Sequence, residues 1–116
     1  ISNLVECINF TDKEIKKLGL KAPMVGHVGD GNFHAIIGYD PNKDGEYEKI
    51  RTLSNKLIDK TLELEGTITG EHGIGLHKKS YLLKEHGDNI PLMKSIKRSI
   101  DQNNIMNPGK IFDLNW

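Results

Sequence analysis

Residues 24–39, MVGHVGDGNFHAIIGY, decide the fold of this 116-residue chain. Two apolar runs, residues 21–28 and 32–39, flank Asp30 and Gly31, and Pro23 marks the shift to extended backbone. An Asp-Gly pair between apolar runs is the strongest short-range signal for a β-hairpin. We therefore expect two antiparallel strands that are joined by a tight turn at Asp30-Gly31.

The turn predicts a register for this hairpin. With a two-residue turn at Asp30-Gly31, or a four-residue loop at residues 29–32, His27 lies directly opposite His34. Directly opposed Cβ atoms lie about 4.5–5.5 Å apart, so two imidazoles could reach one metal ion. The other face is apolar or glycine throughout: Met24, Gly26, Val28, Phe33, Ala35 and Ile37. A three-residue loop would put the histidines on opposite faces and break this apolar set.

Helical patterns surround the hairpin. Apolar residues recur every three or four positions over Asn3–Leu18, with Ser2 as N-cap and Gly19 as C-cap, and over Glu46–Glu65, which ends at Gly66. A short helix before Gly87 and a final helix over Ile90–Asn103 follow, and residues 67–75, TITGEHGIG, form a short β-capable piece that leads into a glycine-rich loop. This order predicts an α+β fold in which helices cover an antiparallel sheet.

Composition limits the classes of function. Sixteen Lys and Arg balance sixteen Asp and Glu without a basic run, which argues against a nucleic-acid partner. The single cysteine, Cys7, allows neither an internal disulfide nor a thiolate zinc site. The chain begins at Ile1 without Met and has neither a signal-peptide pattern nor an apolar stretch of about 20 residues, so we expect part of a longer cytoplasmic protein, dissolved or peripheral to a membrane.

Glu71 and His72 are the second group of candidate site residues. They lie between Gly70 and Gly73, in a segment where glycines permit close approach of a flat ligand, and neighbouring side chains are expected to diverge. With the two hairpin histidines, Glu71 would complete a set of two His and one carboxylate, which leaves positions open for substrate. The alternative is a polar loop with a chance Glu-His pair. Further polar residues have plainer interpretations: Asp30 as a turn residue, and His77 and His86 as solvated residues.

Three motifs resemble the C-terminal region of FAD-linked oxidases that act on D-2-hydroxy acids. They are residues 26–34 (GHVGDGNFH), 66–82 (GTITGEHGIGLHKKSYL) and 105–112 (IMNPGKIF). The likeness runs from about Leu20 to Phe112 and includes cytochrome-type D-lactate dehydrogenase, the glycolate oxidase flavin subunit and D-2-hydroxyglutarate dehydrogenase. It implies that the whole chain, 1–116, is the C-terminal cap or substrate part of a two-domain flavoprotein whose FAD-binding domain is absent from these residues.

The resemblance also implies roles for individual residues. His27, His34 and Glu71 would hold a divalent metal, zinc or manganese, and His72 would be the catalytic base. Gly73 and Gly75 would let backbone approach the flavin ring. Positions matching further motif residues would line the substrate or flavin cleft: Asn32, Lys78, Asn107 and Lys110. Two plainer alternatives stay open here: Asn32 accommodates a positive φ beside the turn, and Lys78 is solvated.

The implied activity is metal-assisted oxidation of a D-2-hydroxy acid to the 2-oxo acid by hydride transfer to FAD. Relatives that act on 2-hydroxyglutarate carry a polar residue where this chain has Ile36, so the resemblance implies a small substrate such as lactate or glycolate. The remaining expected partners are the missing FAD-binding domain and an unidentified electron acceptor, and self-association is compatible with the pattern. A metal-dependent hydrolase and a metal-stabilised interaction domain are the alternatives.

Overall fold

The computed structural model describes residues 1–114 and shows an α+β chain that divides into two compact units. The first unit, Ile1–Gly66, contains helix α1 (Leu4–Leu18), strands β1 (Met24–Val25) and β2 (His34–Ala35), and helix α2 (Glu46–Glu63). The second unit begins at Thr67 and contains helices α3 (Lys79–His86) and α4 (Ile90–Ile100). Single 3₁₀ turns span Val28–Asp30 and Gly87–Asn89. No helix in residues 1–114 is long and apolar enough to cross a membrane.

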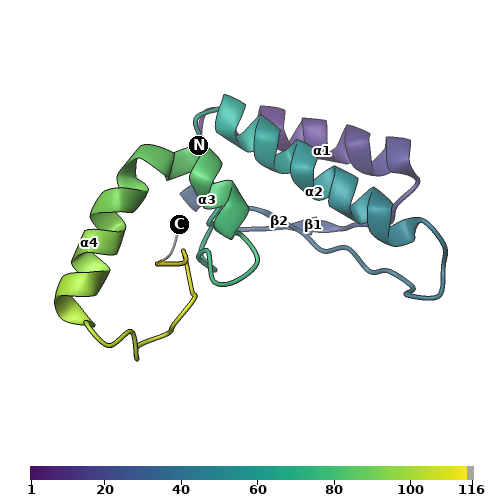
Figure 1. The fold of residues 1–116 in the computed structure, drawn as a ribbon. Coiled ribbons are helices and arrows are strands. Elements are labelled where there is room, and N and C mark those ends of the chain that lie inside the picture. The colour runs from purple at the N-terminus through teal and green to yellow at the C-terminus, as the bar shows by residue number, and fades with distance from the viewer. Residues whose placement is uncertain (115–116) are drawn as a thin grey trace. The chain divides into compact units, whose positions relative to one another are not determined.

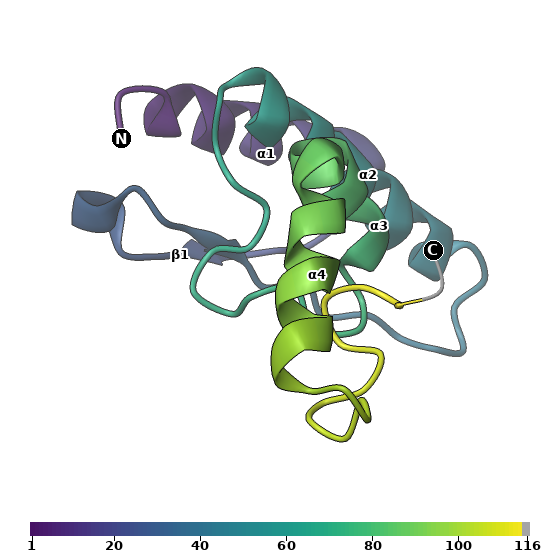
Figure 2. The ribbon, with the colours of Figure 1, turned by 60° about the vertical axis from the view of Figure 1, so that its left-hand side comes forward.

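In the first unit, α1 and α2 lie side by side over the β1-β2 hairpin (Figures 1 and 2). Ile15 of α1, Leu20 and Leu53 of α2 are buried together at the centre. Hairpin residues Met24 and Ile37 pack against these three, so the apolar face of the hairpin contributes to the core. The predicted covering of an antiparallel sheet by helices is confirmed, although each strand has only two residues.

Both long helices of this unit end in the Schellman arrangement, but the left-handed residue differs. Gly19 takes the left-handed position after α1, with φ of 66°, as its residue type predicts. After α2, Glu65 takes it, with φ of 58°, and the following Gly66 donates its N–H to the Thr61 carbonyl at 2.8 Å. A Cβ on Gly66 would lie 2.9 Å from Thr61 Cγ2, so glycine is needed there for close approach rather than for its φ.

Several predicted boundaries are wrong. The N-cap of α1 is Asn3 rather than Ser2, and α2 ends at Glu63 rather than Glu65. Residues 67–75 form no strand, because their backbone groups bond to side chains and to turns rather than to a neighbouring strand.

Helix α4 stops at Ile100 instead of Asn103. Asp101 leaves the helical conformation, and its carboxylate accepts the backbone N–H groups of Ile105 and Met106, each at 2.9 Å. The chain therefore turns back after α4 (Figure 2).

Candidate functional site

The first motif, GHVGDGNFH, forms the closed end of the hairpin. The His27 carbonyl accepts the N–H groups of Asp30 at 2.9 Å and Asn32 at 3.2 Å, which closes a four-residue loop at residues 28–31. Gly31 is the left-handed residue of this loop, with φ of 74°, so the idea that Asn32 accommodates a positive φ is wrong. Asp30 lies exposed in the 3₁₀ turn, as its interpretation as a turn residue predicts.

The predicted register of the hairpin is wrong by two residues. His34 pairs with Val25 and Met24 pairs with Ala35, so His27 is not directly opposite His34. The physical reason is the loop, which covers residues 28–31 instead of 29–32 or the Asp30-Gly31 pair alone. His27 lies at the start of this loop, outside the two-residue strand, and is exposed, whereas His34 is half-buried on β2.

A shift of two residues keeps every side chain on its predicted face. Strand side chains alternate with period two, so only an odd shift would exchange the faces. Met24 and Ile37 accordingly pack against the core, while Val25 and Ile36, which have the same parity as the two histidines on their strands, are exposed. Diagonal neighbours across such a pair lie about 7–8 Å apart, which is a wider span than direct opposition gives.

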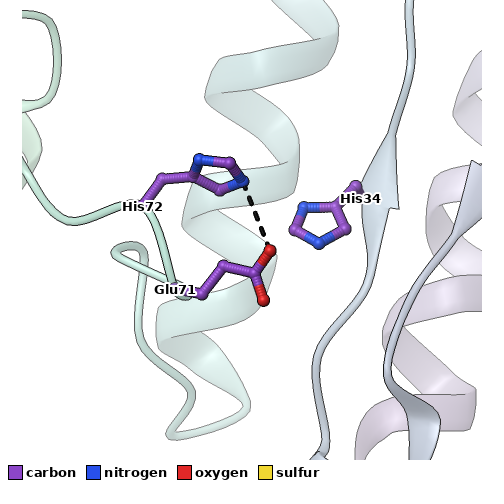
Figure 3. Close-up of side chains that lie close together, drawn as sticks. All are labelled: His34, Glu71 and His72. Carbon is purple, nitrogen blue, oxygen red and sulfur yellow. Dashed lines mark ion pairs between the residues drawn. The ribbon is translucent and has the colours of Figure 1, made fainter.

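The second motif places Glu71 and His72 on an exposed loop of the second unit. Their side chains are 50% and 71% exposed, and His72 Nε2 lies 3.6 Å from Glu71 Oε1. Figure 3 shows the tips of the Glu71 and His72 side chains turned toward one another. The expectation that these neighbouring side chains diverge is therefore wrong: left-handed Gly70 and Gly73, with φ of 51° and 74°, bend the loop on either side of the pair.

Gly73 and Gly75 of this loop face open space. A Cβ added at either glycine would meet nothing within 4 Å, but both have positive φ, 74° and 53°. Their backbone conformation therefore favours glycine, and within residues 1–114 no atom of another residue lies close beside them. Gly75 also accepts the N–H of Ile111 at 2.8 Å, which joins the second motif to the third.

Lys78 is half-buried at the N-cap of α3, and its ammonium is bonded to backbone. Nζ donates to the Ile68 carbonyl at 2.9 Å and lies 3.5 Å from the Thr69 carbonyl. The interpretation of Lys78 as a solvated residue is therefore wrong. His86 likewise has a neighbour, because its Nε2 lies 3.3 Å from Glu85 Oε1, whereas His77 is exposed.

The third motif, IMNPGKIF, is held by residues that the sequence did not single out. Lys79 donates to the Gly109 carbonyl at 3.1 Å and pairs with Asp113 at 2.7 Å. The motif residues Asn107 and Lys110 are exposed, and Asn107 adopts a left-handed φ of 48°. The third motif is thus a turn that Lys79, the first residue of α3, stabilises through its bonds to Gly109 and Asp113.

Asp101 is the other residue that organises this turn. Lys97, which pairs with the Asp101 carboxylate, lowers the pKa of that carboxyl below its usual value, and the backbone N–H groups of Ile105 and Met106 add to this shift while burial opposes it. The sequence pattern placed Asp101 inside the final helix predicted to end at Asn103, so no local signal marked Asp101 as the residue that ends α4. The backbone N–H groups that its carboxylate accepts lie four and five residues later and could not be predicted from that pattern.

A comparison with protein families matches residues 1–111 to the family described as FAD linked oxidases, C-terminal domain. The chain belongs to this family. It is 43% identical over 98% of its length to a probable mitochondrial D-lactate dehydrogenase of Danio rerio, of which it covers 23%. It is 43% identical over 97% of its length to the mitochondrial D-lactate dehydrogenase [cytochrome] 1 of Saccharomyces cerevisiae, covering 19% of that protein.

A bacterial relative belongs to the same group. The glycolate oxidase subunit GlcD of Bacillus subtilis is 39% identical over 97% of this chain, which covers 23% of that subunit. The chain therefore spans about a fifth of the length of these relatives. The resemblance on which the three motifs were interpreted is confirmed at the level of the family.

Proposed function

We propose that this chain is the C-terminal part of an FAD-dependent, metal-assisted oxidoreductase that oxidises a short D-2-hydroxy acid to the 2-oxo acid. The observation that carries the proposal is the match over residues 1–111 to the FAD-linked oxidase family, together with relatives named for D-lactate and glycolate. The FAD-binding domain and the contacts to an electron acceptor lie outside this chain. The proposed location is the cytoplasm, in solution or at a membrane surface, and self-association is compatible with it.

The donor set fits a divalent ion of the zinc or manganese type. His27, His34 and Glu71 offer two imidazole nitrogens and a carboxylate, which are the ligands that such ions take in catalytic sites. Glu71 Oε1 lies 3.6 Å from His72 Nε2, and the Glu71 side chain is half exposed, so its carboxylate is accessible from solvent. A bound divalent ion would lower the pKa of a 2-hydroxyl group, as it lowers the pKa of water.

His72 is the proposed catalytic base. A neutral imidazole accepts the 2-hydroxyl proton, and we assign this to Nε2, the nitrogen that faces Glu71 at 3.6 Å. FAD, when bound, accepts the hydride that leaves C2, so the acid loses one proton and one hydride and becomes the 2-oxo acid.

Ile36 is the proposed specificity residue. Its side chain is 55% exposed and follows His34 by two residues, so it has the parity of the histidine face of the hairpin. An apolar side chain there suits a methyl group or a hydrogen on C2, as in lactate and glycolate. It gives no partner to the second carboxylate of a substrate such as 2-hydroxyglutarate.

The test compares Glu71→Gln and His72→Ala in the full-length gene product. Glu71→Gln removes an anionic ligand, so bound metal falls and added Zn²⁺ or Mn²⁺ restores part of the activity. His72→Ala keeps the metal but slows flavin reduction by about 10²–10⁴, the range for general base catalysis, without rescue by metal. Anaerobic stopped-flow flavin reduction with D-lactate, glycolate and L-lactate, with metal analysis of the same samples, measures both effects.

His77→Ala is the matched control, because His77 is an exposed histidine of the same stretch. It should reduce flavin at the parental rate. Equal metal loss in His72→Ala and Glu71→Gln would make His72 a ligand instead of the base. A metal-dependent hydrolytic activity in a protein without flavin would replace the proposed function altogether.

A further inference from the structure

We propose that Lys78 and Glu85 are positioning residues for the loop that carries Glu71 and His72. The inference rests on the proposed function, because that function makes Glu71 a metal ligand and His72 the catalytic base. Lys78 was expected to line the cleft, but its ammonium bonds to the backbone that enters this loop. We infer that Lys78 acts on the reaction through the position of Glu71 and His72 rather than by touching substrate.

The two side chains hold Ile68 by both of its backbone groups. Lys78 Nζ donates to the Ile68 carbonyl at 2.9 Å, and Glu85 Oε2 accepts the Ile68 N–H at 3.2 Å. Lys78 is the N-cap of α3 and Glu85 lies seven positions later, so two helical turns bring both residues to the same face of the helix. Both backbone groups of Ile68 therefore take their hydrogen bonds from this one face of α3.

These contacts replace the ladder that a strand would provide. Ile68 is buried, with 8% of its surface exposed, and residues 67–75 form no strand. Buried backbone groups need partners, and bonds to charged side chains are the strong ones available. The Lys78 ammonium directs two of its three N–H groups at backbone carbonyls, those of Ile68 and Thr69.

The loop depends directly on this entering segment. The Gly73 N–H donates to the Thr69 carbonyl at 3.2 Å, so residues 70–72 are enclosed by a turn that starts at Thr69. On the far side, the Lys78 N–H donates to the Ile74 carbonyl at 3.3 Å. Lys78 thus contacts the backbone on both sides of Glu71 and His72, by its ammonium before the loop and by its own amide after it.

The experiment uses the full 116-residue chain with ¹⁵N labelling. Lys78→Met keeps the alkyl stem without the donor, Lys78→Arg keeps a charged donor, and Glu85→Met removes the acceptor. Lys13→Met, which changes an exposed lysine of α1, is the matched control. Amide hydrogen exchange at Ile68 and Gly73 reports on the loop, and broadening of the Glu71 and His72 signals by Mn²⁺ reports on the site.

We expect exchange at Ile68 and Gly73 to accelerate about tenfold or more in Lys78→Met, because a lost hydrogen bond to a charged group corresponds to at least one factor of ten. The Mn²⁺ concentration for half broadening should rise by a similar factor, Lys78→Arg should restore both readouts, and Lys13→Met should change neither. Glu85→Met should accelerate exchange mainly at the Ile68 amide, because it removes the acceptor of that N–H group.

The proposal would be overturned if Lys78→Met changed neither the exchange rates at Ile68 and Gly73 nor the Mn²⁺ concentration for half broadening. It would also be overturned if Lys78→Arg showed faster exchange and a higher Mn²⁺ concentration for half broadening, as Lys78→Met is expected to do. If Lys78→Met also loses protection throughout α3, Lys78→Gln is judged by the same criteria, since it keeps a neutral donor. Failure of the proposed function has a different signature. The parental chain would then show no broadening at Glu71 and His72, while the exchange data would still decide the positioning role.

Discussion

Gly26→Ala should open the hairpin that carries His27 and His34. A Cβ at Gly26 would lie 2.4 Å from the Asn32 carbonyl oxygen and 2.5 Å from Phe33 Cα, both of which are backbone atoms. Ordinary van der Waals contact begins near 3.4 Å, so the two sides of the hairpin must separate by about 1 Å. That movement takes the bond from Asn32 N–H to the His27 carbonyl, now 3.2 Å, beyond hydrogen-bonding range.

The expected loss of stability follows from these two effects. Overpacking costs about 1–3 kcal/mol, and a lost backbone hydrogen bond adds about 0.5–1.5 kcal/mol. We therefore expect Gly26→Ala to lower the free energy of unfolding by about 2–4 kcal/mol. For a unit of this size such a loss is a large fraction of the total stability.

Gly29→Ala is the matched control within the same loop. A Cβ at Gly29 meets nothing within 4 Å, and its φ is not positive. The reduced freedom of the unfolded chain should leave this variant unchanged or more stable by about 0.4–1 kcal/mol. Urea unfolding followed by circular dichroism measures both variants, and the cross-strand NOE between Val25 and His34 reports on the pairing. A Gly26→Ala variant that keeps both its stability and this NOE would refute the reasoning.

Three further changes test the packing, a cap and the C-terminal turn. Leu53→Ala should cost about 2.7–5 kcal/mol in urea unfolding, because Leu53 is 1% exposed, whereas Leu92→Ala, at an exposed position, should cost under about 0.5 kcal/mol. Glu65→Gly should raise the free energy of unfolding by about 0.5–1 kcal/mol by relieving the positive φ after α2, and a loss of stability would contradict this. Lys97 lowers the pKa of Asp101 in the folded chain, so this contribution is fully present above the ordinary value of 3.8 and is lost as pH falls through the lower folded value. Asp101→Asn should flatten that part of the stability–pH curve, and an unchanged curve would exclude Asp101 as its source.

The sequence predicted the local elements because their signals are local. Apolar residues at helical spacing place α1 and α2, and Gly19 places the end of α1, since each pattern reports on residues within a turn or two of each other. The two faces of the hairpin could also be predicted, because side chains alternate along any strand whatever its partner is. The three motifs identify the family for a similar reason, as they are read in order along the chain.

The exact pairing of the hairpin depended on the loop. Asp30-Gly31 predicts a tight turn, but the His27 carbonyl accepts two N–H groups and closes the loop at residues 28–31. His34 consequently pairs with Val25, and the direct opposition of the two histidines is lost. The sequence could predict the faces but not the register, because a two-residue shift leaves the same apolar pattern buried.

Only the tertiary structure decided which side chains hold the loops. Lys78 reaches the backbone of Ile68, ten residues earlier, and Lys79 reaches Gly109, thirty residues later. No periodic pattern links such positions, because a lysine side chain bonds to whichever carbonyl the folded chain brings within reach. The sequence by itself thus determined the helices, the faces of the hairpin and the family. The tertiary structure determined the register of the hairpin and the side chains that support the loops of the second and third motifs, since these depend on contacts that no local pattern encodes.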